Sequence, residues 1–197
     1  MTAPNWSLRS SEAADAEIQL LVSIFDDPAI KVLSRAEATE TAFRGDAAAA
    51  TLLHIAAPFR VNGASPLFSS VLLTPDSAAA EGSAEGDGVL EAREVMNLDL
   101  HARTVVFADS ASTSMRNAAP GIELVRWAWR AAGVRTIVLP RWATDDAQDR
   151  AMLKELYARL KAGDAPDVAL QAARAAIRSA GTTRAPFYWA GWMVVGR

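Results

Sequence analysis

The sequence contains no cysteine. This absence excludes disulfide bonds, thiolate metal sites and thiol nucleophiles within the chain. Histidine is nearly as scarce, with only His54 and His101, so we expect no zinc site, no other metal and no cofactor. No apolar run approaches the length of a membrane span. The first residues lack the basic and apolar regions of a secretory signal, which favours a cytoplasmic protein without a membrane partner.

Basic residues are neither abundant nor clustered. The formal net charge is −3, and Lys and Arg form no block or tail. Phosphate binding needs clustered cationic side chains, so the composition argues against a nucleic-acid partner. The apolar fraction is 51% against 22% charged residues, which excludes wholesale disorder. A chain of 197 residues can bury one full core, and we expect a single domain over residues 1–197.

Short apolar runs alternate with amphipathic segments along the chain. Strands are predicted at 30–33, 52–57, 67–74, 104–109, 134–139 and 187–195. Helices are predicted at 15–25, 34–45, 91–98, 121–132, 145–162 and 166–180, the second of them capped by Ser34. This alternation predicts an α/β fold with a mostly parallel sheet. Residues 1–14 are expected to be loose, and the Ala-, Gly- and Ser-rich segment 75–88 is predicted to be a mobile loop.

Two predicted strands end in residues that mark a candidate site. The first runs directly into Pro58 and Phe59, and the second ends in Asp109 and runs into Ser110. In an open α/β sheet, ligands bind beyond the carboxyl ends of the parallel strands. Two roles stay open for Asp109, which either recognises a cation at the rim or caps a neighbouring backbone N–H.

A third strand end precedes Trp142, Asp145 and Asp146. The tryptophan is predicted to lie in the core or in the wall of a cleft. Paired carboxylates can bind magnesium or perform acid–base work, and these two would extend an acidic rim. Thr, Asp and Asp in front of a helix are also typical of a helix N-terminus, which is the interpretation we favour.

Six short motifs resemble, in their order, those of the CHAT domain, a bacterial caspase-like peptidase domain often attached to tetratricopeptide repeats. They lie at residues 33–43, 53–59, 107–112, 121–134 and 142–146, and at 186–190 together with Gly196. The resemblance covers nearly the whole chain. It implies a caspase-like three-layer α/β/α sandwich with a mostly parallel, six-stranded sheet.

The resemblance also implies where catalysis would occur. Active members of the family use a histidine base, a cysteine nucleophile and backbone N–H groups as the oxyanion hole. By position, the base corresponds to Pro58, the next turn residue to Phe59 and the nucleophile to Ser110. Proline has no group that accepts a proton, and a serine hydroxyl needs a positioned base.

We therefore interpret the chain as a catalytically inactive, CHAT-like pseudoprotease that binds a protein or peptide. A tetratricopeptide-repeat protein is among the partners that the resemblance suggests. The candidate binding residues are Asp109, Trp142, Asp145 and Asp146. The alternative is an active peptidase or hydrolase that uses Ser110 as its nucleophile together with an unrecognised base.

The remaining histidine and tryptophans are predicted to be structural. His54 precedes Pro58 by four residues, which at about 3.3 Å per residue is roughly 13 Å of strand, so we expect a hydrogen-bonded core histidine. Trp127 and Trp129 are two positions apart on a predicted helix. They do not share a face, so one is expected to pack on the sheet and the other to be partly exposed. Half-burial of both by neighbouring loops is the alternative that we favour over an exposed partner contact.

Overall fold

A four-stranded sheet lies at the centre of the structure, a computed structural model that describes residues 11–77, 85–108, 126–142, 146–180 and 185–196. Strands β1 (Leu52–Ile55), β5 (Thr104–Phe107) and β6 (Thr136–Pro140) run parallel. Strand β7 (Trp192–Gly196) runs antiparallel to β6 at the edge. The order β1–β5–β6–β7 places three carboxyl strand ends along one side of the sheet.

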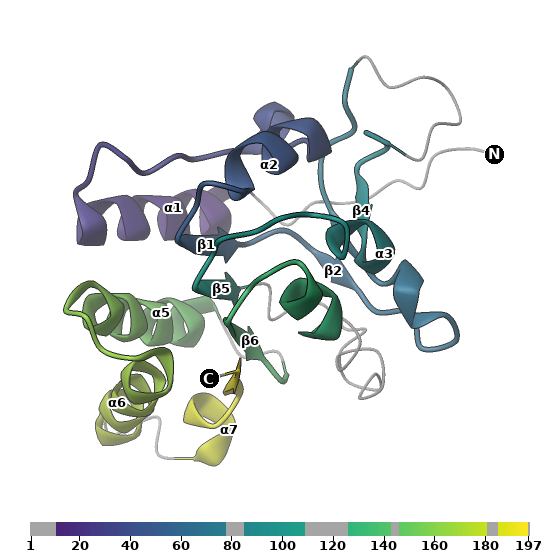
Figure 1. Cartoon of the computed structure of the whole chain (residues 1–197). Coiled ribbons are helices and arrows are strands. Elements are labelled where there is room, and N and C mark those ends of the chain that lie inside the picture. The colour runs from purple at the N-terminus through teal and green to yellow at the C-terminus, as the bar shows by residue number, and fades with distance from the viewer. Residues whose placement is uncertain (1–10, 78–84, 109–125, 143–145, 181–184, 197) are drawn as a thin grey trace.

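Helices cover both faces of this sheet (Figure 1). Helices α1 (Ser11–Phe25), α5 (Asp146–Lys161) and α6 (Pro166–Ser179) pack on one face. Helix α2 (Glu40–Ala47), helix α3 (Ala92–Val95) and the helical residues 126–131 cover the other. The described residues thus form the three-layer α/β/α sandwich that the resemblance to CHAT domains implies.

Alternate residues of each buried strand belong to different layers of the core. Val105 and Phe107 join one hydrophobic cluster, whereas Val106 joins the cluster beneath α5 and α6. This two-sided burial explains the continuous apolar runs in the sequence. Trp129 is 1% exposed and Trp127 is 52% exposed, so the expected division of the two indoles is confirmed and the half-burial of both is wrong.

A second, antiparallel sheet follows β1 in the chain, so the expected count of six strands in one sheet is wrong. It contains β2 (Phe59–Arg60), β3 (Ser70–Leu72) and β4 (Val89–Glu91) in the order β2–β3–β4. The described residues therefore form sheets of four and three strands, and not one sheet of six. The cause lies at Pro58, whose carbonyl oxygen accepts the N–H of Leu72 at 2.8 Å and so starts the local pairing.

The structure also corrects several predicted element boundaries. Residues 30–33 form no strand, and the predicted strand at 67–74 divides into the 3₁₀ turn η2 (Pro66–Phe68) and β3. The predicted terminal strand begins as the short helix α7 (Pro186–Trp189), because Pro186 fits the first helical turn. Helix α1 begins at Ser11, four residues before the predicted start.

The start of α2 differs from its prediction as well. Ser34 makes no capping hydrogen bond and precedes the 3₁₀ turn η1 (Arg35–Glu37). The true cap is Thr39, whose hydroxyl accepts the N–H of Ala42. Thr39 also bridges to Thr74, at the start of the segment 75–88. The described ends of that segment are joined by a hydrogen bond of 2.8 Å from the N–H of Asp76 to the carbonyl oxygen of Gly86.

Candidate functional site

The carboxyl ends of β1, β5 and β6 meet along one edge of the central sheet. At the end of β1, Pro58 offers a carbonyl oxygen that is already hydrogen-bonded to Leu72. The ring of Phe59 packs against the core, 5.8 Å from the ring of Phe107. Phe107 in turn contacts Trp129 edge to face, at 5.2 Å between ring centres. A cluster of aromatic rings in edge-to-face contact therefore fills the core directly behind this strand end.

The end of β5 is described as far as Ala108, which is buried and donates its N–H to Ile55 at 2.9 Å. The predicted site residues Asp109, Ser110 and Asp145 lie outside the described residues. Asp146 is the first residue of α5. This place agrees with the interpretation of Asp146 as part of a helix N-terminus.

The end of β6 carries a group of aromatic and arginine side chains. The indole N–H of Trp142 donates to the carbonyl oxygen of Phe187 at 3.0 Å. The two rings are stacked, with 6.4 Å between centres and 22° between planes. The guanidinium of Arg141 lies 5.3 Å from the centre of the Trp142 ring. Phe187 is 52% exposed, so this stack forms part of the surface.

His54 lies on the side of β1 that α1 and α5 cover, and its imidazole has two close partners. Its Nδ1 is 2.7 Å from the hydroxyl of Tyr157, and its Nε2 is 2.6 Å from a carboxylate oxygen of Glu17. Burial, together with the charge of Glu17, raises the pKa of Tyr157 well above its usual value. The prediction of a hydrogen-bonded core histidine is thus confirmed, and the ring connects α1 to α5 through β1.

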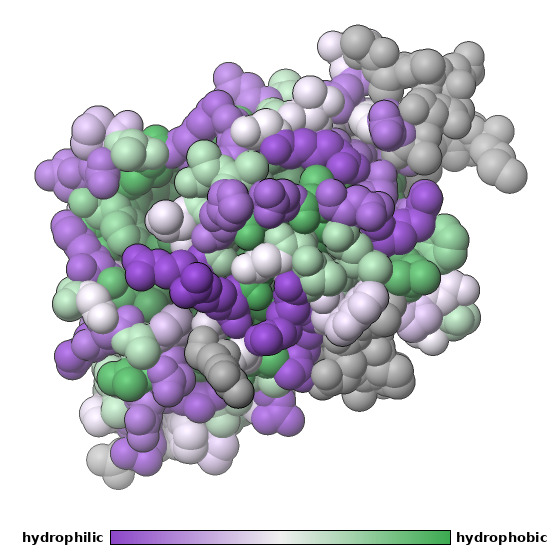
Figure 2. Space-filling model, viewed as in Figure 1, coloured by the Kyte–Doolittle hydropathy of each residue, from purple (hydrophilic) through white to green (hydrophobic). Residues whose placement is uncertain are grey.

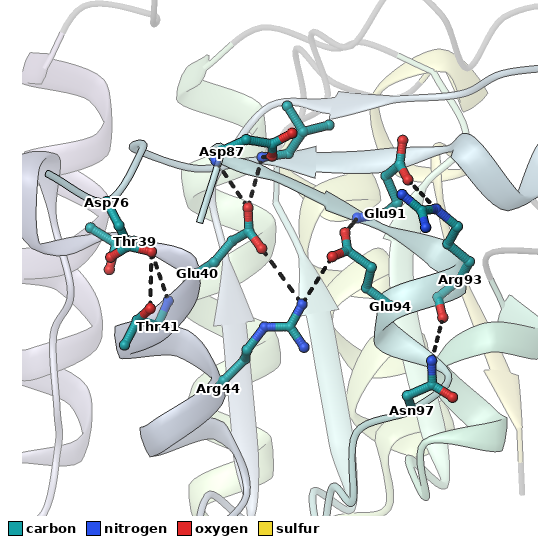
Figure 3. A network of polar contacts seen from close by, with 12 residues as sticks. Thr39, Glu40, Thr41, Arg44, Asp76, Asp87, Glu91, Arg93, Glu94 and Asn97 are labelled. Atoms are coloured by element: carbon teal, nitrogen blue, oxygen red, sulfur yellow. Dashed lines mark hydrogen bonds and ion pairs between the residues drawn. The ribbon is translucent and has the colours of Figure 1, made fainter. Parts of the chain in front are cut away.

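A buried carboxylate organises the opposite side of the molecule (Figure 3). Glu40 is 1% exposed, and its Oε1 accepts the N–H groups of Gly88 and Val89 at 2.9 and 3.0 Å. Arg44 lies between Glu40 and Glu94, at 3.5 and 3.1 Å. This network joins α2 to β4 and α3.

Burial is the main cause of a raised pKa at Glu40, and the negative charges of Glu94 and Asp87 add to it. Hydrogen bonds from backbone N–H groups act in the opposite direction. Glu40 is not among the residues that the sequence patterns single out. The i, i+4 spacing of Glu40 and Arg44 is a signal for the ion pair, but no local pattern indicates the hydrogen bonds to a segment almost fifty positions away.

Within the described ranges, no group of three or more His, Cys, Asp or Glu side chains is arranged to hold a metal ion. Likewise, none of the helices searched in the described residues combines the length and apolar character needed to cross a membrane. The chemistry available at the described strand ends is therefore that of aromatic rings, guanidinium groups and backbone carbonyls.

Comparison with known proteins gives two findings. A family model described as the CHAT domain matches residues 2–197. The human protein "Tetratricopeptide repeat protein 28" is 27% identical over 108 residues, which is 55% of this chain and 4% of the human protein. The aligned region thus spans a small fraction of that relative.

Proposed function

The chain belongs to the CHAT domain family, and we propose that it is a catalytically inactive member that binds a protein or peptide. The observation that carries this proposal is the chemistry of Pro58, at the position of the family's base. Its side chain has no group that accepts a proton, and its carbonyl oxygen is hydrogen-bonded to Leu72. A serine hydroxyl such as that of Ser110 attacks a peptide bond only when a positioned base removes its proton.

The nearest histidine in sequence does not supply the missing base. Both nitrogens of His54 are occupied, one by the hydroxyl of Tyr157 and the other by Glu17. These partners come from α5 and α1, on the face of the sheet that these two helices cover, and not from the strand end. A histidine held in this way connects helices and is not available to a substrate.

Retention of the fold without the base favours a binding role. The resemblance to CHAT domains and the similarity to part of a tetratricopeptide repeat protein both fit an interaction module. We propose a cytoplasmic protein partner, with a tetratricopeptide-repeat protein as the first one to test. The binding residues proposed from the sequence are Asp109, Trp142, Asp145 and Asp146.

The proposal is tested by incubating the purified chain with a diverse peptide library and reading the products by mass spectrometry. We expect no cleavage above that of buffer. Cleavage that persists in Ser112→Ala but disappears in Ser110→Ala would overturn the proposal. The pair of variants separates a true nucleophile from a contaminating protease, because both remove one hydroxyl from the same segment.

The second candidate function is that of a serine hydrolase, favoured by the presence of Ser110 where the family has its nucleophile. A fluorophosphonate probe distinguishes the two functions. An activated serine displaces fluoride from phosphorus and becomes covalently labelled, whereas an unactivated serine does not. Labelling of the wild-type chain that is absent in Ser110→Ala would establish this second function.

A further inference from the structure

Large exposed hydrophobic side chains are scattered over several elements of the structure. Figure 2 shows hydrophilic and hydrophobic residues interspersed across the face that it displays. The most exposed of the large apolar residues are Trp127 and Phe187, each at 52%. Phe187 differs from the others because it is stacked on a second aromatic ring that itself lies beneath a guanidinium. Aromatic and arginine side chains together are typical of the residues that dominate protein interfaces.

Three arginines contact this aromatic group or residues that follow Phe187 in the chain. Arg141 lies over the ring of Trp142, and Arg178 lies 5.8 Å from the centre of the Trp189 ring. Arg174 stands one helical turn before Arg178 on α6 and donates to the carbonyl oxygen of Trp192. We call this set the arginine–aromatic surface, and it consists of Arg141, Trp142, Arg174, Arg178, Phe187 and Trp189.

Backbone pairing fixes these residues at the end of β6. Pro140 pairs with Trp192 across the antiparallel ladder, and the N–H of Arg141 donates to the carbonyl oxygen of Gly191 at 2.6 Å. Arg174 is held at the same place through its bond to Trp192. Arg141 and Arg174 are thus both held by hydrogen bonds to backbone carbonyl oxygens beside the strand end, which reduces the entropy lost when a ligand binds.

The positive charge at this surface is not neutralised by the described part of the chain. None of the ion pairs between described residues involves Arg141, Arg174 or Arg178. The buried Nε of Arg174 has no hydrogen-bond partner there. Burial and the neighbouring charge of Arg141 lower the pKa of Arg174. Two arginines that repel each other and have no ion pair with a described residue favour binding of an anion.

We propose that the arginine–aromatic surface binds an acidic peptide segment, with carboxylates against the guanidinium groups and apolar side chains against the Trp142–Phe187 stack. A carboxylate matches the planar fork of arginine and forms two parallel hydrogen bonds with it. An aromatic ring at half exposure gains from covering by an apolar side chain. The absence of a basic run in the chain favours a peptide over a nucleic acid. This inference rests on the proposed binding function and specifies a partner for Trp142 and the arginines near it; Asp109, Asp145 and Asp146 are not part of the surface that it assigns to the acidic segment.

The test is fluorescence anisotropy with a labelled peptide of alternating Glu and Leu. A second peptide carries Gln in place of Glu, and a third probe is a labelled single-stranded oligonucleotide. We expect the acidic peptide to bind at least about tenfold more tightly than the neutral one, because each lost charge-assisted pair weakens binding severalfold. Affinity should fall when the salt concentration is raised from about 0.05 M to about 0.3 M, since ions screen exposed charges.

Matched variants locate the binding surface. Arg141→Gln and Phe187→Ala should each weaken binding of the acidic peptide by about fivefold or more, the usual effect of losing an interface arginine or aromatic residue. Arg103→Gln and Trp127→Ala are the controls, because these exposed residues lie on other elements, and both should bind as the wild type does. Thermal melting of each variant verifies that it is folded.

Three results would overturn the assignment. They are equal binding of the acidic and neutral peptides, equal effects of the site and control variants, and tighter binding of the oligonucleotide than of the acidic peptide. Failure here is distinguishable from failure of the proposed function. Peptide hydrolysis that depends on Ser110 removes the pseudoprotease proposal whatever the peptide affinity, whereas absent acidic-peptide binding removes only this surface.

Discussion

Glu40 offers a prediction in which two substitutions at one position should behave differently. Its carboxylate is buried and accepts two backbone N–H groups, from Gly88 and Val89. Glu40→Ala leaves the buried N–H of Gly88 without its acceptor, at about 1–3 kcal/mol. The N–H of Val89 also donates to Asp87 Oδ1 at 2.8 Å and keeps that bond. Removal of a desolvated charge close to Glu94 and Asp87 offsets part of this loss. We expect a net destabilisation of about 1–3 kcal/mol.

Glu40→Gln should be much milder. The glutamine side chain keeps an oxygen at the position that accepts the two N–H groups, and it removes the repulsion from Glu94 and Asp87. It loses the contact of 3.5 Å with Arg44, which still pairs with Glu94. We expect stability within about 1 kcal/mol of the wild type, because the ion pair is long and the hydrogen bonds are kept.

The pH dependence follows from the direction of the shift. The pKa of Glu40 is raised in the folded state above its ordinary value of 4.5, so the folded chain binds this proton more tightly than the unfolded chain does. Its contribution is complete below the ordinary pKa and is lost as pH rises through the folded pKa. The wild type should therefore gain stability relative to Glu40→Gln as pH falls from neutral towards 4.5.

The assay is urea unfolding followed by tryptophan fluorescence, for which the chain has six tryptophans. The loss for Glu40→Ala is read as a lower free energy of unfolding, and in a thermal melt it corresponds to a Tm lower by about 2–12 °C in a chain of this size. If Glu40→Gln destabilises the chain as much as Glu40→Ala does, then the charge itself stabilises the network. That result, or a relative loss of wild-type stability at low pH, would refute the reasoning.

Two further predictions concern a glycine with positive φ and the cap of α2. Each has a matched control, and both use the same unfolding assay. Gly133 has φ of +107°, and a Cβ there would lie 2.2 Å from the carbonyl oxygen of Leu100, so Gly133→Ala should destabilise by about 2–4 kcal/mol. Gly45 lies inside α2, where an added Cβ would meet no atom within 4 Å, and should tolerate alanine with a gain of about 0.5–1 kcal/mol; a loss at Gly45 matching that at Gly133 would contradict the steric explanation. Thr39→Ala should cost about 1 kcal/mol through loss of the α2 cap, whereas Ser34→Ala should change stability by less than about 0.5 kcal/mol. Equal effects at Thr39 and Ser34 would show that the cap is not the cause.

Strong local patterns make most of the central sandwich predictable. The apolar runs at β1, β5 and β6 are long enough to identify buried strands, and the stripe of α6 identifies a helix. The residue at which a helix begins is determined less strongly by local sequence. Ser34 and Thr39 are both good caps, and the choice of Thr39 brings Glu40 into reach of Gly88 and Val89, a contact that no short window of sequence contains.

The position of the candidate site stays a prediction from topology. The topology rule directs attention to the ends of β1 and β6, and the structure places Trp142 at the second of these. The aromatic segment beginning at Phe187 resembles a strand in sequence because its residues favour both strands and cores. Pro186 and the stacking of Phe187 on Trp142 instead make it a helical turn with one face outside. Arg174 escapes prediction because an arginine on an amphipathic helix is most often a solvated residue.

The attachment of α1 has a practical consequence for anyone who shortens this protein. Phe25 packs 5.8 Å from the ring of Tyr157, Lys161 donates to the carbonyl oxygen of Ile24 at 2.6 Å, and Glu17 reaches the imidazole of His54. Helix α1 is therefore a component of the folded unit and not a detachable leader. A version that starts after Phe25 would expose the apolar surface around Tyr157 to solvent and would be prone to aggregation. Truncated versions should therefore start before Ser11.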